Sequence, residues 1–593
     1  VLAASVGSGA LASRGATPAA QPCSGVDAEL AAVWNDERRA AVATAIRATR
    51  VPYAEATWQR VEPALDRYAH AWTKMRGESC RAHADARESD RHYDLRHACL
   101  ARRRTALDTL VALLGEATPA DVENAARAAA ALPPLATCAD ADALAAALPP
   151  PDDPAVARAV AAGRDALARA GEYEALGRYA DARALVEPVR SSPEAAAYAP
   201  LAAEAALSLG AIELAATHHE AATAALSDAL ELSLRAGHLD VAAEAFARRI
   251  FTRSQSGAAR EAQADVPLAR ALVERADDDQ LRWLLRNNIG ALHFSMGEFP
   301  EAQADWLAAL RLKERVSGTD HLEYALALAN LGSVATVLGD IPAAREYQLQ
   351  GLAVSERLLG AEHPAVAQRR FNLAVTEHYS GRLDDAHAHM QAAVAAMARA
   401  YGADAEVLFN CFLQLAALAN DRGAHGDALE FVAQADRVRA AHRFDDHPNL
   451  PFVAVHRAVA LAGLGRHDEA MRELLAARAL TERRVSPEHA LAELDDAITR
   501  VALAHGDLDR ALAAARRLLA ARQAASEPAP GPLAFAELRV ADALRAAGEL
   551  TAAATLAEQA LARFLDSPLR HYFLMIAELR LGLGELLLAQ RRP

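Results

Sequence analysis

Small and apolar residues, alanine above all, fill long stretches of this chain, whereas runs of β-branched residues are scarce. Because alanine has the highest intrinsic helix propensity, this pattern predicts an all-α protein. A second pattern lies over the first: a glycine followed five residues later by an alanine recurs every 42 residues, with a single step of 41. The pairs are Gly297/Ala302, Gly339/Ala344, Gly381/Ala386, Gly423/Ala428, Gly465/Ala470, Gly506/Ala511 and Gly548/Ala553, with weaker copies at Gly177/Ala182, Gly210/Ala215 and Gly237/Ala242.

This second pattern indicates a helix hairpin that is copied in series. Glycine ends the first helix because it adopts a backbone conformation that other residues resist, and the alanine lets the second helix approach closely. One hairpin cannot bury its apolar side alone, so neighbouring hairpins must stack into a solenoid with a concave groove. An apolar or small pair before each glycine should face the partner helix: Ile289-Gly290, Leu331-Gly332, Leu373-Ala374 and Leu415-Ala416.

Two stretches of the repeat, "NNIGALHFSMGEFPEA" (287–302) and "ANLGSVATVLGDIPAA" (329–344), resemble the tetratricopeptide repeat family. The joint "GAEHPAVA" (360–367) and the long period are similar to the variety found in kinesin light chains. The resemblance covers about 165–590 and is strongest over 280–560. It implies a right-handed solenoid of about ten helix pairs that binds proteins or peptides, and it does not identify the ligand.

Polar residues recur nine positions before successive glycines, in the middle of the expected first helices. In tetratricopeptide arrays this position faces the concave side, where an amide can both donate to and accept from an extended peptide backbone. Aromatic residues beside these positions would anchor side chains. The alternative is that the amides only tie one repeat to the next or bond a local carbonyl. The predicted groove residues are Asn287, Asn288, Phe294, Asn330, Phe371, Asn372, His378, Tyr379, Asn410, Gln414 and His456.

Four histidines, His321, His363, His447 and His489, fall in the same repeat register. Equivalent positions on successive repeats step along the edge of a solenoid and do not converge on one point. A shared metal site or catalytic dyad is therefore not expected, and these residues are predicted to serve in loops and helix caps.

Cysteine usage sets the first part of the chain apart. Cys23, Cys80, Cys99 and Cys138 all precede residue 140, which suggests two disulfides and an oxidising compartment. Of the three possible pairings we favour Cys80–Cys99 with Cys23–Cys138, because an antiparallel pair of helices on either side of the turn "DARESD" would bring the first two together. Cys411 has apolar neighbours and is expected to be a buried thiol.

A zinc site is the alternative use of the same segment. Two thiolates and two imidazoles suit tetrahedral zinc, although the spacing here matches no familiar finger. The ligands would come from Cys80, His83, His92, His97 and Cys99.

The segment before the solenoid carries a resemblance of its own. The phrases "ATWQRVEPALDRYAHAWTKMRGESC" and "DLRHACLARRRTALDTLVALL" resemble the region that joins membrane helix to repeats in serine/threonine protein kinases of myxobacteria. Trp34, Trp58 and Trp72 are expected to form a core of this module's own. The resemblance implies a kinase domain and one membrane helix before the module, an extracytoplasmic (periplasmic) location, and a tether of which "VLAASVGSGALASRG" is the end.

No kinase motif occurs in the sequence: it contains no VAIK-like lysine, no HRD and no DFG. No catalytic residue, cofactor or metal is therefore predicted within this chain. The net charge of −15 argues against nucleic acid as a partner. The alternative to the kinase context is a free-standing cytoplasmic scaffold with reduced cysteines, and a homodimer is possible in either case.

These patterns divide the chain into six expected segments. They are 1–21, the end of a transmembrane or leader segment with a linker; 22–146, the cysteine-bearing helical module; 147–164, a proline-rich boundary with a linker helix; 165–280, irregular tetratricopeptide-like pairs; 281–565, the regular repeats; and 566–593, a C-terminal capping helix.

Overall fold

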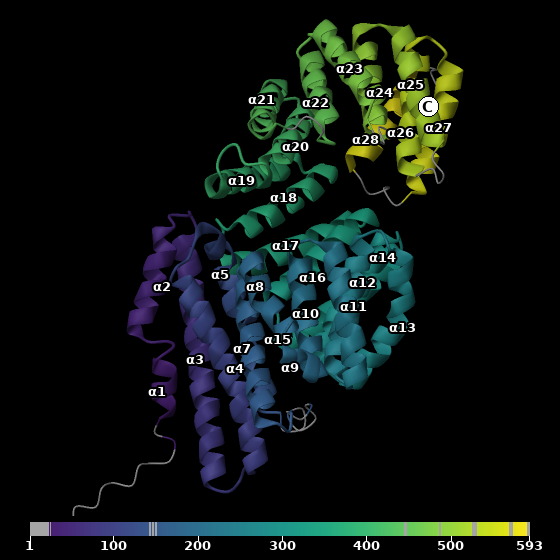
Figure 1. The fold of residues 1–593 in the computed structure, drawn as a ribbon. Helices are drawn as coiled ribbons and strands as arrows, with labels where there is room; N and C mark the ends of the chain where they lie inside the picture. Colours follow the sequence, from purple (N-terminus) through teal and green to yellow (C-terminus); the bar gives the residue numbers. More distant parts are fainter. Residues whose placement is uncertain are drawn as a thin grey trace, which may run out of the picture.

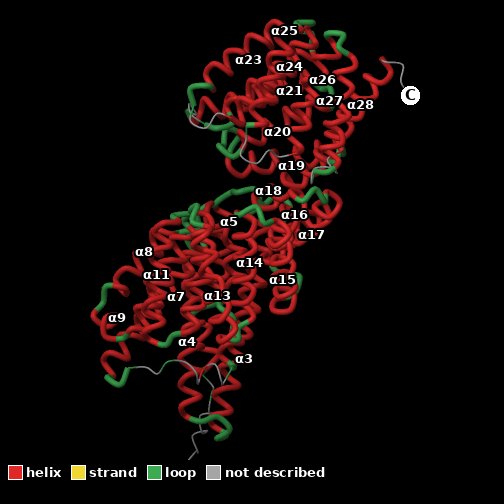
Figure 2. The backbone as a smooth tube through the Cα atoms, turned by 90° about the vertical axis from the view of Figure 1, so that its right-hand side faces the viewer, coloured by secondary structure: helices red, strands yellow, loops and turns green. Residues whose placement is uncertain are grey.

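The protein is all-α throughout the part that the structure, a computed structural model, describes. Its helices form two lobes, the first from α1 to α17 and the second from α19 to α28, with α18 (Pro364–Tyr379) in the neck between them (Figures 1 and 2). The described residues are 23, 25–140, 144, 148, 151–443, 447–484, 488–524, 530–567 and 573–589. The expected membrane or leader segment, 1–21, lies outside them.

The N-terminal module contains two long antiparallel helices, α3 and α4, at the base of the first lobe (Figure 1). Trp72 of α3 is 1% exposed, and its indole Nε1–H donates to the Leu100 carbonyl in α4 at 2.7 Å. The helices of the module are α1 (Val26–Ala31), α2 (Asp36–Ala48), α3 (Ala54–Ala84), α4 (Asp90–Leu114), α5 (Pro119–Ala131) and the 3₁₀ turn η1 (Leu135–Cys138).

The predicted disulfide pairing is wrong, although all four cysteines are in disulfides. The bonds join Cys23 to Cys80 and Cys99 to Cys138. Cys80 lies about one turn from the end of α3, whereas Cys99 lies more than two turns into α4, so the antiparallel helices do not bring them level. The zinc alternative fails for a related reason, because the two sulfur atoms that it needs are bonded to other cysteines.

In the part of the chain that the structure describes, ten helix hairpins follow the module and stack in sequence order. The first hairpin packs directly on the module through α4 and α5, and its first helix runs unbroken through the boundary expected at 164. The pairs are α7 (Pro154–Ala175) with α8 (Tyr179–Arg190), α10 (Ala199–Ala215) with α11 (His219–Ala236), α12 (Leu239–Gln255) with α13 (Ala259–Ala276), α14 (Asp279–Ser295) with α15 (Phe299–Ser317), α16 (Leu322–Val337) with α17 (Ile341–Leu359), α18 with α19 (Leu383–Tyr401), α20 (Leu408–Asp421) with α21 (His425–His442), α22 (Leu450–Gly463) with α23 (His467–Thr481), α24 (Glu488–His505) with α25 (Leu508–Gln523), and α26 (Pro530–Ala546) with α27 (Leu550–Leu565); the short α9 (Pro193–Ala197) precedes α10.

The repeated glycines and alanines act as the sequence predicts. Gly339 has φ 76° and Gly465 has φ 78°, a left-handed conformation that ends the first helix of each pair. Ala344 and Ala470 are 0% exposed at the contact between the two helices. The solenoid hairpins are thus set by two small residues for each repeat.

The module has no separate core, contrary to the expectation from its tryptophans. One hydrophobic core contains Trp58 and Trp72 together with Leu352 and Leu359 of α17 and Leu373 of α18. The array therefore coils back so that its sixth hairpin meets the N-terminal module, which closes the first lobe.

Polar contacts fasten the same junction. Glu123 of α5 accepts two hydrogen bonds there. The Tyr401 hydroxyl donates to the Glu123 carboxylate at 2.8 Å, and His363 Nε2 donates to the Glu123 backbone carbonyl at 2.9 Å. Arg60 of α3 donates to the Arg357 carbonyl at 3.0 Å. We call Glu123, His363 and Tyr401 the clasp.

The second lobe also contacts the first lobe through apolar side chains. Ile341, at the start of α17, packs against Leu538 of α26 and Phe564 of α27. The helix α28 (Phe573–Ala589) packs on α26 and α27 and contacts α18. Among the described residues, no helix is both long enough and apolar enough to cross a membrane.

Candidate partner-binding surfaces

The predicted groove amides form a ladder between first helices. Asn288, which is 5% exposed, donates to the Ala247 carbonyl of α12 at 2.8 Å. Asn287 donates to the Asn288 side-chain oxygen at 3.1 Å, and Asn330 donates in turn to the Asn287 oxygen at 3.2 Å. The structure thus places these three amides in repeat-to-repeat ties, which is the alternative stated for them above.

The other predicted groove residues are distributed differently. Asn372 is exposed and accepts a hydrogen bond only from Gln368 of its own helix, while Asn410 is exposed and accepts from Asn449 at 2.8 Å. Phe294 lies in the interior of its hairpin, 5.6 Å from the ring of Trp306. Phe371 and Gln414 are half-buried.

The predicted histidines His378 and His456 meet an acid inside the second lobe. His378 Nε2 lies 2.7 Å from a carboxylate oxygen of Asp421, and its ring is stacked on Tyr379. Burial, helped by nearby His378, lowers the pKa of His456 to about 4 although Asp421 opposes the shift. Burial, with Glu493 and Asp421, raises the pKa of Tyr379. The ring-bearing residue Tyr379 is 38% exposed.

Three of the four register histidines act as helix caps, as expected. The Nδ1 atom of His321 accepts the Glu323 amide, that of His363 accepts the Ala365 amide, and that of His447 accepts the Asn449 amide. His489 lies inside α24, with its ring 5.8 Å from that of Phe452. In the described part of the chain, no three His, Cys, Asp or Glu side chains are grouped as a metal site would require.

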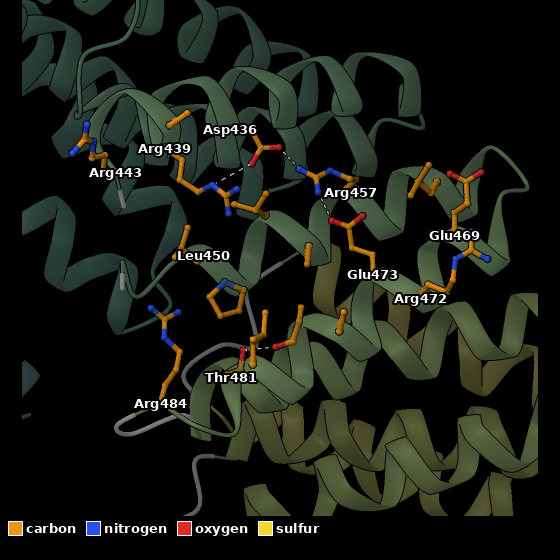
Figure 3. Close-up of a pocket in the computed structure, with 18 residues that line it drawn as sticks. Asp436, Arg439, Arg443, Leu450, Arg457, Glu469, Arg472, Glu473, Thr481 and Arg484 are labelled. Carbon is orange, nitrogen blue, oxygen red and sulfur yellow. Dashed lines mark hydrogen bonds and ion pairs between the residues drawn. The ribbon is translucent and has the colours of Figure 1, made fainter. Parts of the chain in front are cut away.

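A cleft of about 1050 Å³ opens in the second lobe between α21, α22 and α23 (Figure 3). Its floor is apolar and comes from α22, while its walls are the second helices of two neighbouring hairpins. We call it the arginine cleft. Its lining residues include Arg439, Arg443, Arg457, Arg472, Arg484, Asp436, Glu469, Glu473, Pro451, Val453, Ala454, Leu461, Ala476 and Leu480.

An exception to the repeat creates this cleft. Leu331, Leu373 and Leu415 stand 42 residues apart and are at most 1% exposed, but the next position in the series is Arg457. The Arg457 guanidinium forms ion pairs with Asp436 of α21 and Glu473 of α23, across the gap between the two helices (Figure 3). Polar side chains reach across this gap, whereas apolar side chains fill the corresponding gap between α19 and α21 over α20.

The charges of the cleft are not balanced within it. Arg457 is paired, Arg439 lies 3.6 Å from Asp436, and Glu469 is paired with Arg466 outside the lining set. Among the described residues, Arg443, Arg472 and Arg484 have no carboxylate within ion-pair distance, and Arg484 donates instead to the His447 carbonyl at 3.0 Å. Among the described residues that line the cleft, five arginines face three acids, an excess of two positive charges in a chain of net charge −15.

The sequence analysis missed this cleft, although the repeat contains a signal for it. An arginine at a position that holds leucine in three preceding repeats cannot pack as a core residue without acids nearby. Comparing each register position for charge, as well as for the glycine and alanine, would have singled out Arg457.

Comparison with protein families agrees with the geometry of the hairpins. Residues 280–356 and 326–397 each match the family model of the tetratricopeptide repeat. Residues 280–397 of this chain carry tetratricopeptide repeats. The matched residues span α14 to α19, and the hairpins on either side share the glycine and alanine pattern. A tetratricopeptide array is a protein-binding scaffold, because its stacked hairpins present extended surfaces.

Three solved structures are similar to parts of this chain. BtubC (BKLC) from P. vanneervenii is 22% identical with a TM-score of 0.35, over 39% of this chain and 94% of that one. A putative kinesin light chain from Podosopora anserina is 20% identical with a TM-score of 0.31, over 35% and 98%. A Rap protein complexed with Competence and Sporulation Factor is 14% identical with a TM-score of 0.38, over 65% and 99%. None of the curated proteins matches the sequence.

Proposed function

We propose that this protein is the partner-sensing region of a membrane-bound serine/threonine kinase, and that it binds a protein or peptide on the extracytoplasmic side of the membrane. The observation that carries the binding part is the tetratricopeptide array, whose hairpins stack in sequence order along the described part of the chain. The kinase part rests on the resemblance of the module, residues 22–146, to the membrane-proximal region of myxobacterial-type kinases.

Exposed residues on the first helices mark the binding surface of this proposal. Asn372 has an amide available to a peptide backbone, and Tyr379, on the same helix, has an exposed aromatic ring. Aromatic anchors and amides are the side chains that peptide-binding surfaces use most effectively. Asn287, Asn288 and Asn330 form ties between successive first helices and are therefore not part of this surface.

A peptide array probed with the whole chain tests this surface. Replacing Asn372 and Tyr379 together with alanine is expected to weaken capture by about tenfold or more, since it removes an anchor and a backbone contact. Asn330→Ala is the matched control, because it removes an amide of the same repeat register that ties helices together and should leave capture within about twofold. Equal capture by the double variant and the native chain would contradict the proposed surface.

The disulfides support the extracytoplasmic location, because such bonds persist in oxidising compartments. Alkylation of the native protein followed by mass spectrometry tests this point. Only Cys411 is expected as a thiol, and even this group should react slowly, since burial raises its pKa to about 12. Alkylation of four further cysteines would favour the cytoplasmic scaffold and contradict the location.

The kinase part has a separate test in the reading frame upstream of Val1. A kinase catalytic domain followed by one membrane helix is expected there. A frame without them would contradict the kinase context and leave the binding function standing.

A further inference from the structure

We propose that the arginine cleft is a docking site for an acidic amphipathic helix of a partner protein. The cleft is formed by second helices, α21 and α23, and it is therefore a separate surface from the first-helix residues Asn372 and Tyr379. It goes beyond the proposed function in adding a site and naming the chemistry of its occupant.

The size and walls of the cleft fit a helix. An α-helix with its side chains is about 11 Å across and rises about 1.5 Å per residue, which corresponds to about 140 Å³ per residue. A space of about 1050 Å³ therefore accommodates roughly two turns. The walls are themselves helices, so the occupant would lie between α21 and α23 in a helix-in-groove arrangement.

The floor favours a helix over an extended peptide. It consists of the apolar side chains of Pro451, Val453, Ala454 and Leu461, and the exposed Leu480 stands at the rim. An extended peptide on this floor would leave its backbone N–H and C=O groups without partners, because the wall helices use their own backbone groups internally. A helix brings its backbone groups already paired and lays an apolar face on the floor.

The charge of the cleft selects an acidic occupant. Arg443, Arg472 and Arg484 lie along the two walls without an ion-pair partner among the described residues. Carboxylates on both flanks of a bound helix would meet these guanidinium groups, which bind carboxylates in paired hydrogen bonds. Arg457 is already neutralised by Asp436 and Glu473, so it shapes the cleft and does not supply the attraction.

The probe that tests the site is a fluorescein-labelled peptide of leucine, alanine and glutamate patterned as an amphipathic helix. Its fluorescence anisotropy is titrated with the whole chain at low and at high salt. Two further peptides carry lysine in place of glutamate, or prolines that prevent a helix. We expect binding of the glutamate peptide alone, weakened by salt because the contacts are between partly exposed charges.

Variants of the chain locate the binding. Arg443→Glu with Arg472→Glu is expected to weaken the affinity about tenfold or more, because two attractive contacts become repulsive. Arg437→Glu, an exposed arginine on α21 outside the cleft, is the matched control and should change it less than about twofold. Ala476→Trp adds bulk on an exposed wall position and should also abolish binding without a cost to folding.

Three results would overturn the proposal: unchanged affinity in both cleft variants, equal loss in the Arg437 control, or equal binding of the proline peptide. These failures are distinct from failure of the proposed function. The latter is read on the peptide array with the Asn372 and Tyr379 variant, in which every residue of the arginine cleft is native.

Discussion

Two neighbouring parts of the second lobe share one repeat and are packed differently. Between α19 and α21 the gap over α20 is filled by apolar side chains, whereas between α21 and α23 the gap over α22 holds ion pairs and stays open. Leu415 is 1% exposed, and the side chain of Arg457, at the same register, is 27% exposed. The corresponding residues, 42 positions apart, are Val394 and Asp436, Leu415 and Arg457, and Phe431 and Glu473.

The difference shows that the fold and the surface depend on different residues. The hairpin around the cleft keeps its left-handed Gly465 and its fully buried Ala470, like the hairpins before it. Glycine and alanine fix the backbone of each repeat, and the layer between the hairpins is then free to vary. Between α21 and α23 that layer consists of Asp436, Arg457 and Glu473, and the gap there is open.

The largest effect is expected from placing a charge in the packed layer. Leu415→Arg buries a guanidinium among apolar neighbours that offer no acid at the equivalent places, and it should cost about 3–5 kcal/mol in the free energy of unfolding. Urea denaturation followed by circular dichroism measures it. A loss below about 1 kcal/mol would mean that the packed layer tolerates charge as readily as the cleft does.

The next largest loss of stability is expected in the first lobe alone, on removal of a disulfide. Replacing Cys99 and Cys138 with alanine opens a disulfide that spans 39 residues, and it should cost about 2–4 kcal/mol through the gain in freedom of the unfolded chain. The loss should appear in hydrogen exchange of the first lobe only. Faster exchange in α24 to α26 would show that the two lobes unfold as one unit.

A smaller effect depends on pH and belongs to the second lobe. Burial lowers the pKa of His456 to about 4, against about 6.5 in an unfolded chain. The unfolded state then takes up the proton first, so the stability that neutral His456 contributes is present above about pH 6.5 and is lost as the pH falls towards 4. Thermal unfolding of His456→Gln should depend less on pH over this range than that of the native chain or of the control His505→Gln. Identical pH profiles would contradict the assignment.

The smallest effect concerns the clasp that closes the first lobe. Tyr401→Phe removes the hydrogen bond to Glu123 and keeps the ring, so it should cost about 0.5–1 kcal/mol. Hydrogen exchange in α5 should rise by a few fold, with α22 and α23 as the unaffected reference. No change in α5 would mean that the apolar core alone holds the junction.

The sequence predicted the repeat well because its signals are local. A left-handed glycine and a fully buried alanine each follow from the geometry of a single hairpin, and Gly339 and Ala344 show both. The prediction of the disulfide pairing failed because the pairing depends on the lengths of α3 and α4. It also depends on where Cys23 and Cys138 lie against these two helices. The prediction of a separate core for the module failed for a similar reason. Leu359 packs against the module only because the whole array curves back towards it.

The groove residues were predicted as a set but do not act as one. The ladder of Asn287, Asn288 and Asn330 shows that a recurrent amide can tie one repeat to the next and need not face a ligand. The spacing of the amides in the sequence does not distinguish these two roles. The arginine cleft, in contrast, is marked by a departure from the pattern at Arg457. In a repeat protein, agreement between repeats indicates structure and disagreement indicates a site.

The most direct test fills the arginine cleft with the apolar side chains that fill the neighbouring gap, between α19 and α21. The triple variant Asp436→Val, Arg457→Leu and Glu473→Phe restores the residues found 42 positions earlier, so its free energy of unfolding should equal or exceed that of the native chain. Anisotropy titration with the acidic helical peptide should then show no binding. Native affinity in a folded triple variant would contradict the account.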